Sequence, residues 1–212
     1  MKVNNFFLEQ QKGFTLGELL ITVSIMMILG VVVIITIKPA ELLRQSRDAR
    51  RISDLSELNI AIERYIAQVR PVVLGSDRSN GLGSGACYVS LASNTGLDVN
   101  TCGGRFAGVN GTVISASNSR VLSGTGWIPV KLTDIPAGTP FAVLPVDPKS
   151  PNTAGANLSL VTDDLYYAYA KQGKRFEINA RLESKKYASS SVTDGGDNNS
   201  LYEVGIGIGL NL

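Results

Sequence analysis

The 212-residue sequence contains no histidine and only two cysteines. Without histidine, the Ser-His-Asp and Cys-His arrangements that activate many nucleophilic enzymes are excluded, and so is the commonest zinc ligand. The 20 lysines and arginines nearly balance the 18 aspartates and glutamates, so no overall field of either sign attracts nucleic acid or a membrane surface. The carboxylates show no spacing typical of an acid and base pair, and no enzymatic activity is expected.

The two cysteines, Cys87 and Cys102, are too few for a structural zinc site, but their even number and moderate spacing suit one disulfide. A disulfide would place this part of the chain outside the cytosol, and for a loop of this length it is worth about 3 kcal/mol. The alternative is two unpaired cysteines, buried as small apolar side chains.

Charge is missing from one long run. Residues 19–37 carry no charged side chain, and at helical rise they span roughly 28 Å, close to the hydrocarbon core of a bilayer. Valine and isoleucine would suit a strand in water, but in lipid the backbone must satisfy its own hydrogen bonds, which favours a helix. Pro39 follows the run and is expected to kink or locally unwind the helix rather than stop it.

The next segment, residues 39–70, is amphipathic. Its apolar side chains recur in steps of three and four: Ile52, Leu55, Leu58, Ile62, Tyr65, Ile66 and Val69. This stripe predicts a helix packed on the sheet of its own domain. On other faces Arg44 and Arg50 lie four residues before Asp48 and Asp54, the spacing of helical ion pairs, and Pro71 is expected to end the helix.

After Pro71 the apolar runs are short and rich in β-formers, and strands are expected at 87–91, 112–116, 126–132, 158–161, 165–170, 175–182 and 201–208. In RFEINARL the apolar side chains of Phe176, Ile178 and Ala180 alternate with those of Glu177, Asn179 and Arg181. That alternation predicts an antiparallel strand with one face in water.

The sequence KGFTLGELL at residues 12–20 resembles the processing motif of type IV prepilins. In that family a prepilin peptidase cuts after the glycine on the cytoplasmic side, the new N-terminal phenylalanine is N-methylated, and a glutamate shortly after it is characteristic. The resemblance implies a cut between Gly13 and Phe14, methylation of Phe14, and a role for Glu18 in assembly. Gly17 departs from the family pattern, in which an apolar residue is more usual.

The position of Glu18 at the edge of the apolar run has a physical explanation. A carboxylate at the edge of an uncharged membrane stretch costs several kcal/mol unless it meets a cation. Cleavage creates that cation, because the freed amine of Phe14 is largely protonated near neutrality and methylation keeps the charge. Pairing with the amine of a neighbouring subunit, as in the family's filaments, would set the register between helices.

The C-terminal part also resembles pseudopilin-like proteins. LPVDP at 144–148, LYYAYA at 165–170 and FEINARLES at 176–184 occur in the family's order: a Pro-Asp-Pro loop, an aromatic strand, and a strand ending in Leu-Glu-Ser. Residues 72–140 match no recognised pattern and are expected to form a variable region of loops and strands.

Major pseudopilins of type II secretion bind calcium in a C-terminal loop. In this chain TDGGDNNS at 193–200 offers oxygen ligands from Asp194, Asp197, Asn198 and Asn199, and its glycines let a loop wrap around an ion. The segment falls short of an EF-hand pattern. The simpler interpretation is a solvated turn, and no other cofactor is expected.

A signal peptide and a plain membrane anchor are two alternative interpretations of the apolar run. A secretory signal peptide has a shorter apolar region, and KPAELL offers no small-x-small cleavage site. An ordinary single-pass anchor fits the hydropathy but does not require the glycine, phenylalanine and glutamate at these spacings.

The positive-inside rule predicts a topology opposite to the one that the prepilin resemblance implies. Basic residues are more numerous after the run (Lys38, Arg44, Arg47, Arg50 and Arg51) than before it (Lys2 and Lys12), which would leave the C-terminal domain in the cytoplasm. The prepilin motif and the expected disulfide favour export instead. The interleaved acids Glu41, Asp48, Asp54 and Glu57 are expected to pair with the arginines between subunits.

The sequence therefore predicts an α+β pilin fold. Its parts are a leader (1–13), a transmembrane and filament-core helix (14–38), an amphipathic continuation of that helix (39–70) and an extracytoplasmic β-rich domain with an antiparallel sheet (71–212).

The resemblance implies a structural subunit of a type IV pilus or type II secretion-like filament. Its partners would be copies of itself and other pilins, the prepilin peptidase, an assembly ATPase and an inner-membrane platform, with no direct binding of nucleic acid. The subunit would lie in the cytoplasmic membrane and then in an extracellular or periplasmic filament. The alternative is a membrane-anchored extracytoplasmic binding domain that does not polymerise, with Trp127, Tyr166, Tyr167 and Tyr169 as contact aromatics.

Overall fold

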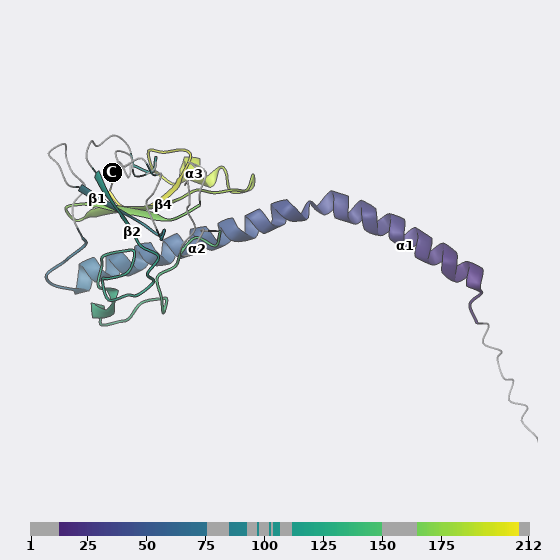
Figure 1. The fold of residues 1–212 in the computed structure, drawn as a ribbon, viewed down its shortest axis with the longest axis horizontal. Helices are drawn as coiled ribbons and strands as arrows, with labels where there is room; N and C mark the ends of the chain where they lie inside the picture. Colours follow the sequence, from purple (N-terminus) through teal and green to yellow (C-terminus); the bar gives the residue numbers. More distant parts are fainter. Residues whose placement is uncertain are drawn as a thin grey trace, which may run out of the picture. The chain divides into compact units, whose positions relative to one another are not determined.

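The computed structural model describes residues 13–75, 85–92, 97, 102, 104–106, 112–149 and 165–207. The chain divides into two compact units, Met1–Leu42 and Leu43–Leu212. Within the described residues an apolar helix is followed by a second helix and a five-stranded sheet (Figure 1). The predicted α+β fold is confirmed.

Helix α1 spans Leu16–Ile37 and buries none of its side chains. The hydroxyls of Thr22, Ser24 and Thr36 donate to backbone carbonyls one turn earlier, at 2.7 to 2.9 Å. These polar groups are therefore satisfied inside the helix, as an apolar surrounding requires. By length and composition α1 is the one helix among the described residues that is able to cross a membrane.

The interruption expected at Pro39 falls at Lys38. This residue follows α1 in the left-handed conformation, with φ of 50°, and helix α2 begins immediately after it and spans Pro39–Gln68. The helix does not stop for good, because Pro39 occupies the first helical position, where its missing N–H would have no partner.

The sheet consists of β1 (Gly85–Val89), β2 (Thr112–Ala116), β3 (Ala168–Gln172), β4 (Arg175–Ala180) and β5 (Tyr202–Ile206), in the order β2-β1-β3-β4-β5. The pairs β1–β3, β3–β4 and β4–β5 are antiparallel, whereas β1 and β2 are parallel. The sheet is therefore mixed, and the prediction of a wholly antiparallel sheet is wrong for its β1–β2 edge.

Apolar side chains cover both faces of the sheet. On one face the α2 residues Leu55, Leu58, Ile62 and Tyr65 pack in a cluster with residues of β3 and β4, including Tyr169, Phe176 and Ile178. On the other face Cys87, Ala168 and Ala170 form a second cluster with Tyr166 and Phe106. Cys87 and Cys102 form a disulfide in this second cluster, with Cα atoms 6.3 Å apart. The amphipathic helix and the disulfide are as predicted.

The strand predicted at 126–132 does not form. Apart from one isolated bridge between Ser123 and Lys131, this stretch is irregular, and a short 3-10 helix, η1 (Leu132–Asp134), follows. Pro129 lacks the N–H that a paired strand needs. Its apolar neighbours are buried all the same, because the loop packs into the α2 side of the core and Trp127 Nε1 donates to the Pro145 carbonyl at 2.9 Å. The strand predicted at 158–161 lies outside the described residues.

The water-exposed face predicted for β4 is also wrong. Glu177 and Asn179 are as thoroughly buried as Phe176 and Ile178 on the opposite face. The segment that precedes β5, including the short helix α3 (Ser190–Thr193), contacts β5. Polar alternation along β4 therefore marks a buried polar layer and not a solvated surface.

Candidate functional site

The predicted cleavage site lies in extended chain directly before α1. Apart from its two neighbours in the chain, no described residue comes within 4 Å of the position that a Cβ on Gly13 would occupy, and Phe14 is 86% exposed. Thr15 has the extended conformation of an N-cap residue, with ψ of 151°. The bond between Gly13 and Phe14 is therefore accessible. The rest of the predicted leader, residues 1–12, lies outside the described part of the chain.

Glu18 closes the N-terminus of α1 through a capping box. Its Oε2 accepts the Thr15 N–H at 2.9 Å and the Thr15 hydroxyl at 2.8 Å, while Thr15 Oγ1 accepts the Glu18 N–H at 3.2 Å. Each residue thus satisfies a donor that a helix terminus leaves open. The capping role of Thr15 was not predicted, although its Thr-x-x-Glu spacing is the usual signature of this motif.

The surface of α1 is apolar on every side. Glu18 is its only charged residue, and no other described part of the chain covers any of its side chains. A patch of this size on a monomer in water is far larger than soluble proteins tolerate. The helix therefore needs a lipid or protein surrounding.

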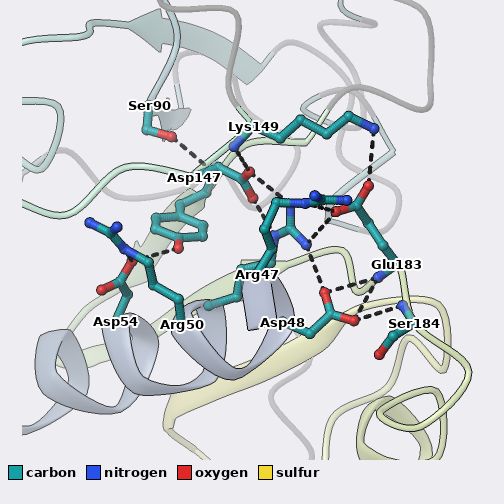
Figure 2. A network of polar contacts seen from close by, with 11 residues as sticks. Arg47, Asp48, Arg50, Asp54, Ser90, Asp147, Lys149, Glu183 and Ser184 are labelled. Carbon is teal, nitrogen blue, oxygen red and sulfur yellow. Dashed lines mark hydrogen bonds and ion pairs between the residues drawn. The ribbon is translucent and has the colours of Figure 1, made fainter. Parts of the chain in front are cut away.

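A buried ionic network fixes α2 within the second unit (Figure 2). Arg51 is completely buried. Its Nε and Nη2 donate to the two oxygens of Asp147 at 2.7 and 2.9 Å, and its Nη1 donates to Asp48 at 2.7 Å and to Glu183 at 3.0 Å. A two-pronged guanidinium–carboxylate contact of this kind is the strong form of a hydrogen-bonded ion pair.

The carboxylates of the network are satisfied in turn. Asp48 accepts the backbone N–H groups of Glu183 and Ser184 at 2.7 to 3.0 Å, and Asp147 accepts the Lys149 N–H at 2.8 Å. Glu183 also pairs with Arg47 at 2.7 Å and with Lys149 Nζ at 3.0 Å. Each of these three carboxylates thus receives several donors, which is the condition under which buried ion pairs are tolerated.

The network shifts the pKa of its members. Burial by itself would raise the pKa of Glu183, but hydrogen bonds from Arg47, Lys149 and Arg51 outweigh burial and lower the pKa to about 2. Burial would likewise lower the pKa of Arg51, but the carboxylates around it raise the pKa instead. Glu183 and Arg51 are therefore both charged at neutral pH.

The network joins three segments that are far apart in the sequence. Asp147 belongs to LPVDP, Glu183 and Ser184 end FEINARLES, and both motifs meet at the same turn of α2. The sequence predicted the order of these motifs but not their contact with each other. Asp48 lies inside this contact and is completely buried, so the prediction that it pairs between subunits is wrong, whereas its predicted pair with Arg44 stays a prediction.

The second predicted helical pair is present. Arg50 Nε lies 3.8 Å from Asp54 Oδ2, and Asp54 also accepts the hydroxyl of Tyr167 at 2.8 Å. Burial raises the pKa of Asp54. This contact ties the middle of α2 to the residue just before β3.

The four aromatics that the binding-domain alternative needs are all buried. Trp127, Tyr167 and Tyr169 lie in the core beneath α2, and Tyr166 lies in the cluster around the disulfide. They support the fold, and none forms a contact surface.

The proposed calcium ligands do not assemble around a common point. The two oxygens of Asp194 accept the N–H groups of Gly196 and Glu203 at 3.0 and 2.8 Å, and the Asn198 side chain accepts the Ser200 N–H at 3.0 Å. Asp197 and Asn199 are exposed. Among the described residues no group of three or more acidic side chains, histidines or cysteines is placed to hold a metal. This arrangement fits a hydrogen-bonded turn and does not fit a calcium loop.

Comparisons with protein-family models, with curated proteins and with solved structures found no match to this chain. Inferences about function therefore rest on the residues and geometry described above.

Proposed function

We propose that this chain is a prepilin-like subunit, a pilin or pseudopilin, that is cut between Gly13 and Phe14 and polymerises through α1. One observation carries the proposal: an accessible glycine–phenylalanine bond directly precedes a helix that is apolar on all sides and whose only charge, Glu18, lies in its first turn. A simple membrane anchor requires the apolar helix but neither the bond nor the charge.

Cutting this bond would place a cation close to Glu18. The new terminus would be Phe14, adjacent to the residue whose N–H the carboxylate already accepts. In a bundle of α1 helices the amine of one copy and Glu18 of the next would neutralise each other in a medium where each is costly alone. The proposed role of Glu18 is therefore to set the register of the filament core.

The second unit supports a structural role. Its α2 helix is held by apolar contacts and by the Arg51 network, and its aromatics are buried in the core. In the proposed filament this unit would face outward, in the periplasm or outside the cell. The disulfide between Cys87 and Cys102 is consistent with such an oxidising location.

Mass spectrometry of the protein from its native membrane tests the proposal. The expected N-terminus is N-methylated Phe14, heavier than unmodified Phe14 by one CH2 group. An intact Met1 on protein that is inserted in the membrane would contradict processing and would leave the membrane-anchored domain as the function.

A further inference from the structure

On the face of β4 and β5 that bears the buried polar layer, two carboxyl groups lie side by side. Asn179 of β4 pairs directly with Glu203 of β5, and Glu177 is two residues before Asn179 on the same face. Glu177 and Glu203 are therefore diagonal neighbours, within reach of each other's side chains. They are only 1% and 2% exposed.

Each carboxyl has one oxygen with a donor and one without. Glu177 Oε1 accepts Asn179 Nδ2 at 3.1 Å, and Glu203 Oε2 accepts the Asn198 N–H at 3.1 Å. Within the described part of the chain, Glu177 Oε2 and Glu203 Oε1 are buried with no hydrogen-bond partner. Two buried carboxylates in this state would repel each other and leave two acceptors unsatisfied, whereas one proton between them supplies the missing donor.

Neither glutamate takes part in an ion pair among the described residues. The charged groups that act on the pair from the covering segment are Asp194 and Asp197, and both are acidic. Arg175 begins β4 and Arg181 follows its last residue, and by alternation both lie on the same face as Glu177. Arg105, the nearby buried cation, stacks over the Tyr166 ring at 4.1 Å.

The segment 189–200 packs directly against Glu203. A Cβ on Gly196 would overlap Glu203 Oε2 in its present position, so a larger residue there would displace the Glu203 side chain, and Gly195 has the left-handed φ of 88° that turns the chain. Asp194 and Asn198, on either side of these glycines, bond to the N–H and the carboxylate of Glu203. Asp194, Gly196 and Asn198 of TDGGDNNS are thus in direct contact with β5.

We propose that Glu177 and Glu203 share a proton and thereby form a pH-dependent latch that holds the segment 189–200 against β5. Loss of the shared proton leaves two adjacent negative charges under this cover, and the cover opens to let water reach them. β5 is an edge strand of the sheet, so opening exposes its outer side. This device does not depend on whether the chain polymerises.

The direction of the pH dependence follows from the burial of the pair. Burial, first, and then the mutual repulsion of the carboxylates raise the pKa of Glu177, and burial with the nearby Asp197 and Asp194 raises the pKa of Glu203. A raised carboxyl pKa stabilises the closed state at low pH, and that stability is lost as the pH rises through neutrality. An open pocket of about 410 Å³, lined in part by Asp194, Glu203 and Gly205, lies next to the latch.

Hydrogen–deuterium exchange of the full chain in detergent, from about pH 5 to about pH 9, tests the latch. Rates are divided by those of an unstructured peptide to remove the intrinsic effect of pH. Between about pH 7 and about pH 9 the protection of peptides from 189–200 should fall about tenfold per pH unit, because the closed state holds one more proton than the open state. The protection of peptides from the buried part of α2, Asp48 to Tyr65, should not change with pH.

Variants sharpen the test. Glu177→Gln carries a neutral side chain that still donates a hydrogen bond, so protection should stay high across the range. Asp134→Asn, which removes an exposed carboxylate paired with Lys131, should leave the fall unchanged. A corrected protection that is flat in the natural protein, or that falls equally in Glu177→Gln, overturns the latch.

A second measurement does not depend on any variant. Infrared spectra of the natural protein should contain a buried, protonated carboxyl band that persists above neutral pH, and its absence overturns the proposal. If calcium ions added at about pH 9 restore full protection, the pair is a cation site and the latch is likewise overturned.

Discussion

Arg51 and Asp147 are 96 residues apart in the sequence, yet two hydrogen bonds of 2.7 and 2.9 Å join them in the interior of the protein. Both side chains are almost completely buried. The contact fastens the first part of α2 that lies in the second unit to the loop before the aromatic strand. Its removal is therefore a direct test of how this unit is held together.

Arg51→Met leaves Asp48 and Asp147 buried without their main cation. Removing one partner of a buried ion pair costs about 3 to 5 kcal/mol. Urea unfolding of the full chain in detergent, followed by the fluorescence of the single tryptophan, Trp127, measures this loss. Arg50→Met is the matched control, because its 3.8 Å pair with Asp54 involves a largely exposed arginine, and its expected cost is below about 1 kcal/mol. Equal losses in the two variants would contradict the network.

Acid should weaken the same network. The pKa of Glu183 is lowered from its ordinary value to about 2, so its contribution is complete above about pH 4.5 and is lost as the pH falls toward 2. The free energy of unfolding should decline across that range, and more gently in Glu183→Gln. The slopes of the two proteins between about pH 4.5 and about pH 2 are the quantity to compare, and identical slopes would exclude Glu183 as a source of the acid sensitivity.

Glu18→Ala tests assembly. The variant should insert and be processed normally, because the alanine is compatible with a helix and leaves Gly13 untouched, but its yield of filaments should fall severely. Filaments sheared from cells and counted by electron microscopy give that yield. Glu63→Ala, at an exposed position of α2, is the control. A normal filament count for Glu18→Ala would refute the proposed register role.

Substitutions at two glycines near the cut test whether the peptidase needs a small residue at Gly13 and whether it needs a glycine at Gly17. Gly13→Leu should block cleavage, because a bulky side chain would obstruct the close approach of the peptidase to the backbone. Gly17→Ala should be processed normally, since the structure leaves open space around Gly17. The ratio of uncut to cut protein on a gel, with the N-terminus sequenced, reports both results. Efficient cleavage of Gly13→Leu would show that the cut lies elsewhere.

The disulfide closes a separation of 15 residues. Replacing Cys87 and Cys102 together by serine should lower the free energy of unfolding by about 3 kcal/mol. A reducing agent should destabilise the natural protein by a similar amount and should not affect the double variant. An effect of the agent on the double variant would mean that it acts through something other than this bond.

Features set by local spacing were predictable from the sequence. The apolar run of α1, the stripe on α2, the pair of Arg50 with Asp54 and the disulfide depend on neighbours in sequence or on a single choice of partner. The Arg51 network was not predictable, because Asp147 and Glu183 lie in segments whose meeting with α2 depends on the whole sheet. Local helical spacing suggested Arg44 as a partner of Asp48 but did not indicate that the tertiary fold turns Asp48 inward to Arg51.

The two errors in the sheet have a common cause. Alternation along β4 identifies which side chains share a face but not whether that face meets water, so Glu177 and Asn179 were wrongly expected at the surface. In 126–132 burial without pairing produced a strand-like pattern, even though Pro129 breaks the pairing. In both places a pattern of polarity was interpreted as a pattern of exposure or of hydrogen bonding.

The capping box at the start of α1 consists entirely of atoms of Thr15 and Glu18. A cut between Gly13 and Phe14 removes none of them, and the Thr15 N–H remains a peptide amide. The helix would thus begin at the same residue in the precursor and in the mature chain. Maturation at this position would change the charge of the N-terminus without changing the backbone conformation at the start of α1. No rearrangement of the helix would have to follow the cut.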